Sequence, residues 1–174
     1  MLLFAHTGIT LGLARLTELS IHPRKIDYRI VLVGSMLPDL IDKPIGIFIL
    51  GNVFSNGRIF SHTILFHLVL LLLGLYFYRK FGRIEFLTLF FCSGFHLVLD
   101  QMWLMPRTLF WPLYGWTFPK YNLTNWIPNI FEALLRDPVL RVSESMGLII
   151  LLISGGQLLR QKRLIIFLRS GVMR

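Results

Sequence analysis

Two uninterrupted apolar blocks constrain the fold of this chain more than any other feature. Residues 64–78 and 86–99 contain no Lys, Arg, Asp or Glu. Charged residues make up 16% of the chain, against about 25% in an ordinary soluble domain. Blocks of this composition are typical of helices that contact lipid or one another inside a bilayer. We therefore predict an all-α, multi-pass membrane protein that forms a single domain over residues 1–174.

The hydropathy pattern predicts about five helical spans, although a full crossing needs roughly 20 residues. The first span is short, and Pro38 and Pro44 predict that the second is broken into two half-helices. The expected spans cover residues 2–17, 30–50, 60–78, 84–104 and 145–168.

The connection over residues 105–143 is too polar and too rich in proline to span a membrane. All four tryptophans lie within it or at its edge, namely Trp103, Trp111, Trp116 and Trp126. Amphipathic rings of this kind settle at the level of the lipid headgroups. We expect the connection to lie on the outer membrane surface as a cap, with an interfacial belt of rings favoured over a substrate-binding box.

The positions of the basic residues predict the orientation of the spans. Lys and Arg exceed Asp and Glu by 18 to 9, which in a soluble protein would suggest nucleic-acid binding. In a membrane protein an excess of Lys and Arg marks the cytoplasmic side instead. If the N-terminus is outside, the inner segments and their flanks hold Arg15, Arg24, Lys25, Arg29, Arg79, Lys80, Arg83, Arg160, Lys162, Arg163, Arg169 and Arg174. We therefore predict an outer N-terminus, a cytoplasmic C-terminus, and lipids rather than nucleic acid as partners.

Ionisable side chains inside the expected spans indicate a functional site. A charge at the bilayer centre costs about 2.5–3.5 kcal/mol, so such a residue usually faces a cavity, a partner or a metal. The polar set is His6 in the first span, Asp39 and Asp42 in the second, Ser61 and His62 at the start of the third, and His96 and Asp100 near the end of the fourth. The last two are four residues apart, the spacing by which one helical face offers two ligands to a metal.

Span direction places this polar set at one depth. Inward spans begin close to His6 and His62, an outward span ends close to Asp100, and Asp39 lies past the middle of another outward span. All of them fall in the outer half of the bilayer, which predicts one site of histidines and carboxylates that opens outward. Mixtures of imidazole and carboxylate suit zinc and related divalent metals.

Three motifs carry a resemblance to a known family. They are Gly34-Ser-Met-Leu-Pro-Asp39-Leu-Ile-Asp42-Lys-Pro44, Gly57-Arg58-Ile-Phe-Ser61-His62-Thr63 and His96-Leu-Val-Leu-Asp100, and His6 precedes them. In this order, to about residue 115, the chain resembles the YdjM-type membrane-bound metal-dependent hydrolases, a family distantly similar to zinc-dependent phospholipase C and P1 nuclease. The resemblance implies an integral membrane protein, phosphoester hydrolysis, and a metal at the positions that match His6, Asp39, His62, His96 and Asp100.

The chain departs from the family pattern at two places. The commoner motif is Pro-Asp-x-Asp, whereas here two residues separate Asp39 from Asp42. Gly57 stands where many members have a histidine before the arginine. These departures make Asp42 a base or bridging carboxylate rather than a certain ligand, and they favour a site with fewer metals.

The leading hypothesis is a hydrolase that cleaves a phosphoester or related ester of an amphiphilic small molecule. Its metal, most simply zinc, would lower the pKa of a water toward about 7. Asp42 would be the base or bridging carboxylate, Arg58 or Lys43 would neutralise the substrate's negative charge, and Ser61 would support the ligands. The sequence contains no nucleophile elbow, so covalent catalysis is not expected.

The same residues also fit other hypotheses. His6 could be a buried hydrogen-bonding histidine, Asp42 could form an ion pair with Lys43 or Arg58, and His67 is expected to be structural. A transporter would use the same carboxylates and the broken second span, with a homodimer supplying the missing repeat. A structural subunit, in which polar residues only hold helices together, is the third possibility.

Overall fold

The computed structural model describes residues 2–20, 26–122 and 126–173, and all regular structure in these ranges is helical. The predicted all-α class is confirmed for this part of the chain. Its elements are η1 (Ala5–Ile9), α1 (Thr10–Ser20), α2 (Tyr28–Lys43), η2 (Pro44–Ile49), α3 (Gly51–Phe54), η3 (Phe60–His62), α4 (Ile64–Phe81), α5 (Glu85–Leu99), η4 (Met102–Leu104), α6 (Pro106–Leu109), α7 (Trp126–Arg136), α8 (Pro138–Arg160) and α9 (Leu164–Ser170). Arg24, Lys25 and Arg174 lie outside the described residues, as does the side chain of Trp126.

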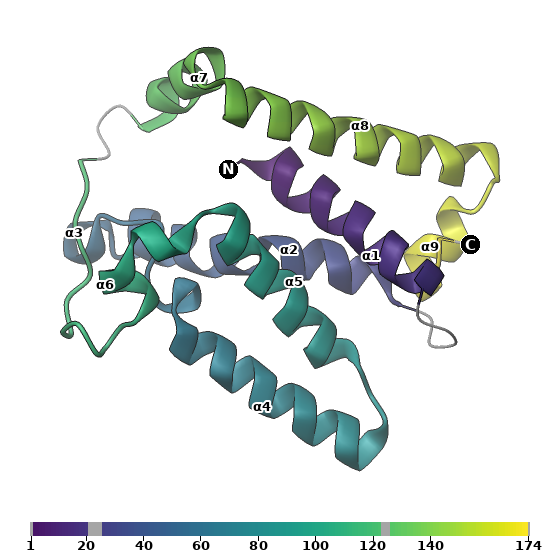
Figure 1. The fold of residues 1–174 in the computed structure, drawn as a ribbon, viewed down its shortest axis with the longest axis horizontal. Coiled ribbons are helices and arrows are strands. Elements are labelled where there is room, and N and C mark those ends of the chain that lie inside the picture. Colours follow the sequence, from purple (N-terminus) through teal and green to yellow (C-terminus); the bar gives the residue numbers. More distant parts are fainter. Residues whose placement is uncertain (1, 21–25, 123–125, 174) are drawn as a thin grey trace.

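Helix α2 lies between two helical pairs (Figure 1). Helix α5 packs along α2 and α4 packs against α5, while α1 packs on α2 and η1 packs on α8. Glycines permit the closest approaches. A Cβ on Gly34 of α2 would lie 2.9 Å from the Cβ of Cys92 in α5, and a Cβ on Gly8 of η1 would overlap the backbone of Gly147 in α8. Small residues at these contacts let helices approach closely without polar side chains between them.

Two helices in the described part of the chain are long and apolar enough to cross a membrane, α4 and α8. Only 17% of the α4 window and 28% of the α8 window is buried, so most of this apolar surface faces outward. Helices α5 and α2 are shorter, with 15 and 16 residues. The count of five spans therefore stays a prediction.

The prediction that the second span is broken into two half-helices is wrong. Helix α2 runs through Pro38 and continues directly into the π-helix η2. Pro38 removes only the backbone donor that would bond to the carbonyl of Gly34, and the helical backbone continues through it. Two other carbonyls of this turn accept hydrogen bonds from side chains of neighbouring elements. The carbonyl of Ser35 accepts from His96, and that of Pro38 accepts from Ser61.

The connection after α5 ends earlier than predicted, because α8 begins at Pro138. The side chain of Asp137 accepts from the first backbone N–H groups of that helix. An aspartate cap followed by proline at the first position is a strong helix start, so residues 138–143 belong to α8.

The rest of the connection packs onto the segment that carries His62. Trp111 meets Phe60 of η3 edge to face, at 5.5 Å between ring centroids, and stacks on Phe118 at 5.3 Å. Trp116 in turn meets Trp111 edge to face. These rings hold the connection against η3, although Trp116 itself is 78% exposed.

Candidate metal centre

The predicted polar residues converge in one buried cluster, although they come from four separate segments. His6 lies in η1, Asp39 in α2, His62 in η3, His96 in α5, and Asp100 directly after α5. The three imidazoles are fully buried, and the two carboxylate side chains are 6% and 2% exposed. The structure thus brings together the residues that span direction placed at one depth.

Asp39, His62 and His96 form the first group of candidate ligands. The Oδ1 atom of Asp39 lies 3.8 Å from Nε2 of His62 and 3.9 Å from Nε2 of His96. Ligand atoms around a tetrahedral zinc, with bonds of about 2.0–2.1 Å, lie roughly 3.3–3.5 Å apart. Small side-chain shifts would therefore let these three atoms surround a divalent cation.

The second nitrogen of each imidazole in this group is held by a neighbour. Nδ1 of His62 donates to a carboxylate oxygen of Asp42 at 2.7 Å, and Nδ1 of His96 donates to the carbonyl of Ser35 at 2.7 Å. With Nδ1 as the donor, the neutral form of each imidazole, which is the form that binds a metal, has its lone pair on Nε2. Both Nε2 atoms are buried and have no hydrogen-bond partner. A buried acceptor without a donor is costly, and a metal ion would satisfy both at once.

In Asp39, as in the two imidazoles, one atom is held by a neighbour and the other points to the centre of the group. Its Oδ2 atom accepts from Nζ of Lys43 at 2.6 Å, which leaves Oδ1 directed at the two imidazoles. The Lys43 contact spans one helical turn of α2 and fixes the rotation of the carboxylate. All three ligand candidates thus present one oriented atom to a common point.

Asp42 supports His62 and its backbone. Its carboxylate is fully buried and accepts the backbone N–H groups of Ile59, Ser61 and His62, in addition to Nδ1 of His62. Three of these donors contact Oδ2 and one contacts Oδ1, so the carboxylate is held in place as a support for His62, and its use as a base or bridging carboxylate stays a prediction. Ser61 adds a hydrogen bond between η3 and α2, because its hydroxyl donates to the carbonyl of Pro38.

Lys43 and Arg58, the two cations of the site, form ion pairs with carboxylates other than Asp42. Lys43 pairs with Asp39, and Arg58 pairs with Asp100 at 2.8 Å. The alternative in which Asp42 forms an ion pair with either cation is therefore wrong. The short segment from residue 59 to 62 supplies enough donors to satisfy Asp42 instead.

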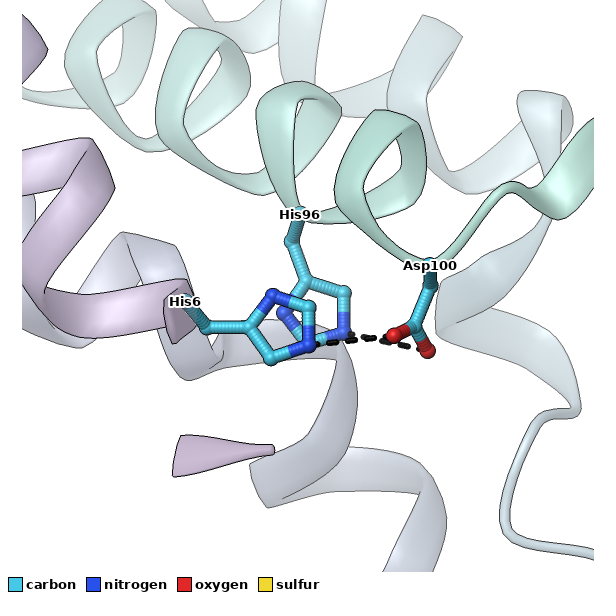
Figure 2. Close-up of side chains that lie close together, drawn as sticks. All are labelled: His6, His96 and Asp100. Atoms are coloured by element: carbon cyan, nitrogen blue, oxygen red, sulfur yellow. Dashed lines mark hydrogen bonds and ion pairs between the residues drawn. The ribbon is translucent and has the colours of Figure 1, made fainter. Parts of the chain in front are cut away.

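His6, His96 and Asp100 form the second group, shown in Figure 2. The rings of His6 and His96 stack at 3.8 Å between centroids, and Nε2 of His6 lies 3.0 Å from Oδ1 of Asp100. Arg58 donates to Oδ2 of Asp100, so both oxygens of this carboxylate are engaged. The two groups share His96, whose single free lone pair can bind only one metal ion.

His67 lies close to the cluster but has no free nitrogen. Its Nδ1 donates to the carbonyl of Thr63, and its Nε2 accepts from the hydroxyl of Ser93, both at 2.9 Å. These two bonds agree with the structural role expected for a residue on a different face of its span.

Glu144 in α8 is a further buried residue that shapes the cluster. Its carboxylate accepts the backbone N–H groups of Leu2, Phe4 and Ala5, at 2.6, 3.0 and 3.2 Å. These bonds hold the start of η1 against α8 and so set the position of His6. The sequence pattern does not single out Glu144, because the apolar run that predicts the last span begins only at residue 145.

Comparison with known proteins agrees with the membrane character of the fold. The profile of the YdjM inner membrane protein family matches residues 1–163, a range that includes the whole ligand cluster and both long apolar helices. Comparisons with curated proteins and with solved structures gave no match. The chain belongs to the YdjM inner membrane protein family.

Proposed function

We propose that this protein is a membrane-embedded hydrolase that depends on a divalent metal, most simply zinc. The observation that carries the proposal is the pair of buried Nε2 atoms of His62 and His96, which lack hydrogen-bond partners and converge on one oxygen of Asp39. Catalytic zinc sites use such sets of three protein ligands and keep a further position open. In this proposal Asp100 and His6 border that open position.

The residues around the ligands fit hydrolysis of a phosphoester of an amphiphilic substrate. When bound, a divalent metal supplies a water of lowered pKa and polarises an ester oxygen. Lys43 and Arg58 orient two of the carboxylates and place positive charge where a phosphate would lie. Asp42 keeps the imidazole of His62 in the tautomer that leaves Nε2 free for a ligand.

Hydrolysis is tested with protein purified into lipid nanodiscs and supplied with zinc. We expect release of phosphate from at least one lipid phosphate ester, and loss of this release in the His62→Ala variant. A cation flux in proteoliposomes without hydrolysis of any lipid phosphate would favour the transporter and overturn the proposal.

We also propose a topology of five spans, with the site and the N-terminus on the outer side and the C-terminus in the cytoplasm. In a Cys92→Ser background, a cysteine at Asn122 should react with a membrane-impermeant thiol reagent in intact cells. A cysteine at Phe81, which is 55% exposed at the end of α4, should react only after the membrane is opened. The reverse labelling pattern would move the site to the cytoplasmic side.

A further inference from the structure

A cavity of about 310 Å³ lies at the edge of the candidate metal centre. Lys43 and Arg58, the two cations that hold the ligand carboxylates, both line it. Its other walls include Ile47 of η2, Gly57 and Ile130 of α7. The volume is at the lower end of the range for small-molecule sites, about 300–1,000 Å³.

The two cations have donors left for a ligand. Lys43 gives one hydrogen bond to Asp39, and Arg58 gives one charged hydrogen bond to Asp100 and a weak contact to the sulfur of Met105. An ammonium has three donors and a guanidinium has five, so both can bind an anion in the cavity without releasing their carboxylates.

The charge of the centre favours an anion once a metal is bound. Three carboxylates, Asp39, Asp42 and Asp100, stand against two cations, and the imidazoles that hold the metal are neutral. The balance is one negative charge, which a divalent cation changes to one positive charge. A phosphate monoester, with about −1.5 to −2 charges at neutral pH, gains more from this field than a singly charged diester does.

The chain passes closely over one wall of the cavity at Gly57. A Cβ at this position would lie 3.2 Å from Cγ of Lys43 and 3.1 Å from Cδ1 of Ile47. The side chain of Asn56 is already used, because its amide donates to the carbonyl of Pro119 and its oxygen accepts from the backbone of Arg58. The charged donors on this wall therefore belong to the two cations, and the hydroxyl of Tyr121 is a further polar group of the lining.

Two of the elements that line the cavity, α7 and η2, also expose apolar side chains. Helix α7 contributes Ile130 to its lining and exposes Phe131 and Leu135, which are 63% and 72% exposed. Element η2 exposes Phe48 and Ile49, at 73% and 71%. In a membrane protein, an amphipathic helix with such exposed residues lies at the headgroup level with its apolar face toward the acyl chains.

We infer that this cavity binds the phosphate of a lipid phosphomonoester, with Lys43 and Arg58 on the phosphate and the acyl chains along η2 and α7. The inference rests on the proposed function and narrows its substrate from esters of amphiphiles to lipids with a terminal phosphate.

Filling the cavity tests the inference without changing a metal ligand. Ile130→Trp adds bulk to the lining, and Glu132→Trp is the matched control, because Glu132 is exposed, lies about 200° away around the same helix and does not line the cavity. The probe is a dihexanoyl phosphonate analogue of phosphatidate, which cannot be hydrolysed, with dihexanoyl phosphatidylcholine and inorganic phosphate as comparisons. Zinc content and binding are measured separately on protein in nanodiscs.

We expect Ile130→Trp to keep its zinc and to bind the phosphonate at least about tenfold more weakly, whereas Glu132→Trp stays within about twofold of the wild type. The wild type should prefer the phosphonate over phosphatidylcholine and over inorganic phosphate by about tenfold or more. Equal binding of the phosphonate by the wild type and Ile130→Trp, or no preference over either comparison ligand, would overturn the inference.

The same measurements distinguish a failure of the proposed hydrolase function from a failure of the cavity inference. A wild type without zinc that still binds the phosphonate in a manner sensitive to Ile130→Trp would support the cavity and refute the hydrolase. A zinc-containing protein that hydrolyses other esters but does not bind the phosphonate would refute the cavity alone.

Discussion

Replacing either His62 or His96 by alanine is expected to remove the bound metal from the purified protein. Each imidazole presents a buried Nε2 without a hydrogen-bond partner. Loss of a residue that only supports a ligand typically lowers metal affinity roughly 10–100-fold, so loss of a ligand should lower it by more than about 100-fold. Elemental analysis gives the metal content, and circular dichroism shows whether the helices persist. Asp100→Asn should deplete the metal as well, because this carboxylate borders the same position.

His67→Ala is the matched control for these variants. This histidine is also buried in the third expected span, but both of its nitrogens are hydrogen-bonded to neighbours. The His67→Ala variant should therefore keep its metal. A wild type that is active without metal, or a metal content that none of the ligand substitutions alters, would refute the proposed centre.

The sequence predicts which residues meet, because the position of a residue along its span gives its depth in the bilayer. Once spans alternate in direction, the distance of His6 or Asp100 from a span end gives its height, and residues at equal height can converge. The predicted convergence agrees with the observed cluster. Polar residues in apolar spans also need partners, which restricts the alternatives further.

The sequence does not predict which atom of each residue is free. That depends on contacts such as the one between His96 and the carbonyl of Ser35, 61 positions apart in the chain. It also depends on the segment before His62, whose backbone donors surround Asp42 and keep it from pairing with a cation. Backbone groups carry no residue signature, so spacing and composition cannot reveal these contacts.

The sequence also does not predict the continuity of α2 through Pro38. Proline inside a helix usually predicts a kink or a break. Here the turn around Pro38 receives donors from His96 and Ser61, two residues of the site itself. These bonds do not replace the one that Pro38 removes, which belongs to the carbonyl of Gly34, but they attach α5 and η3 to this part of α2 and orient the imidazole of His96.

Glu144→Ala is expected to destabilise the protein strongly, although the residue touches no candidate ligand. Its carboxylate satisfies three backbone N–H groups at the start of η1, two of them at 3.0 Å or less. The N–H group of Ala5 is buried and those of Leu2 and Phe4 are partly buried, so the total cost, at about 1–3 kcal/mol for each fully buried donor, should be roughly 2–3 kcal/mol. For a chain of this length, that corresponds to a fall of about 4–12 °C in the unfolding midpoint.

Glu144→Gln separates the hydrogen bonds from the bulk of the side chain. The glutamine keeps the shape and one acceptor oxygen, so its unfolding midpoint should fall between those of the wild type and Glu144→Ala. Thermal unfolding in detergent and metal content should change in the same order, because η1 carries His6 into the cluster. If Glu144→Ala unfolds at the wild-type temperature with its metal intact, then the docking of η1 on α8 does not depend on this carboxylate, and the close contact between Gly8 and Gly147 would have to hold the two elements together by itself.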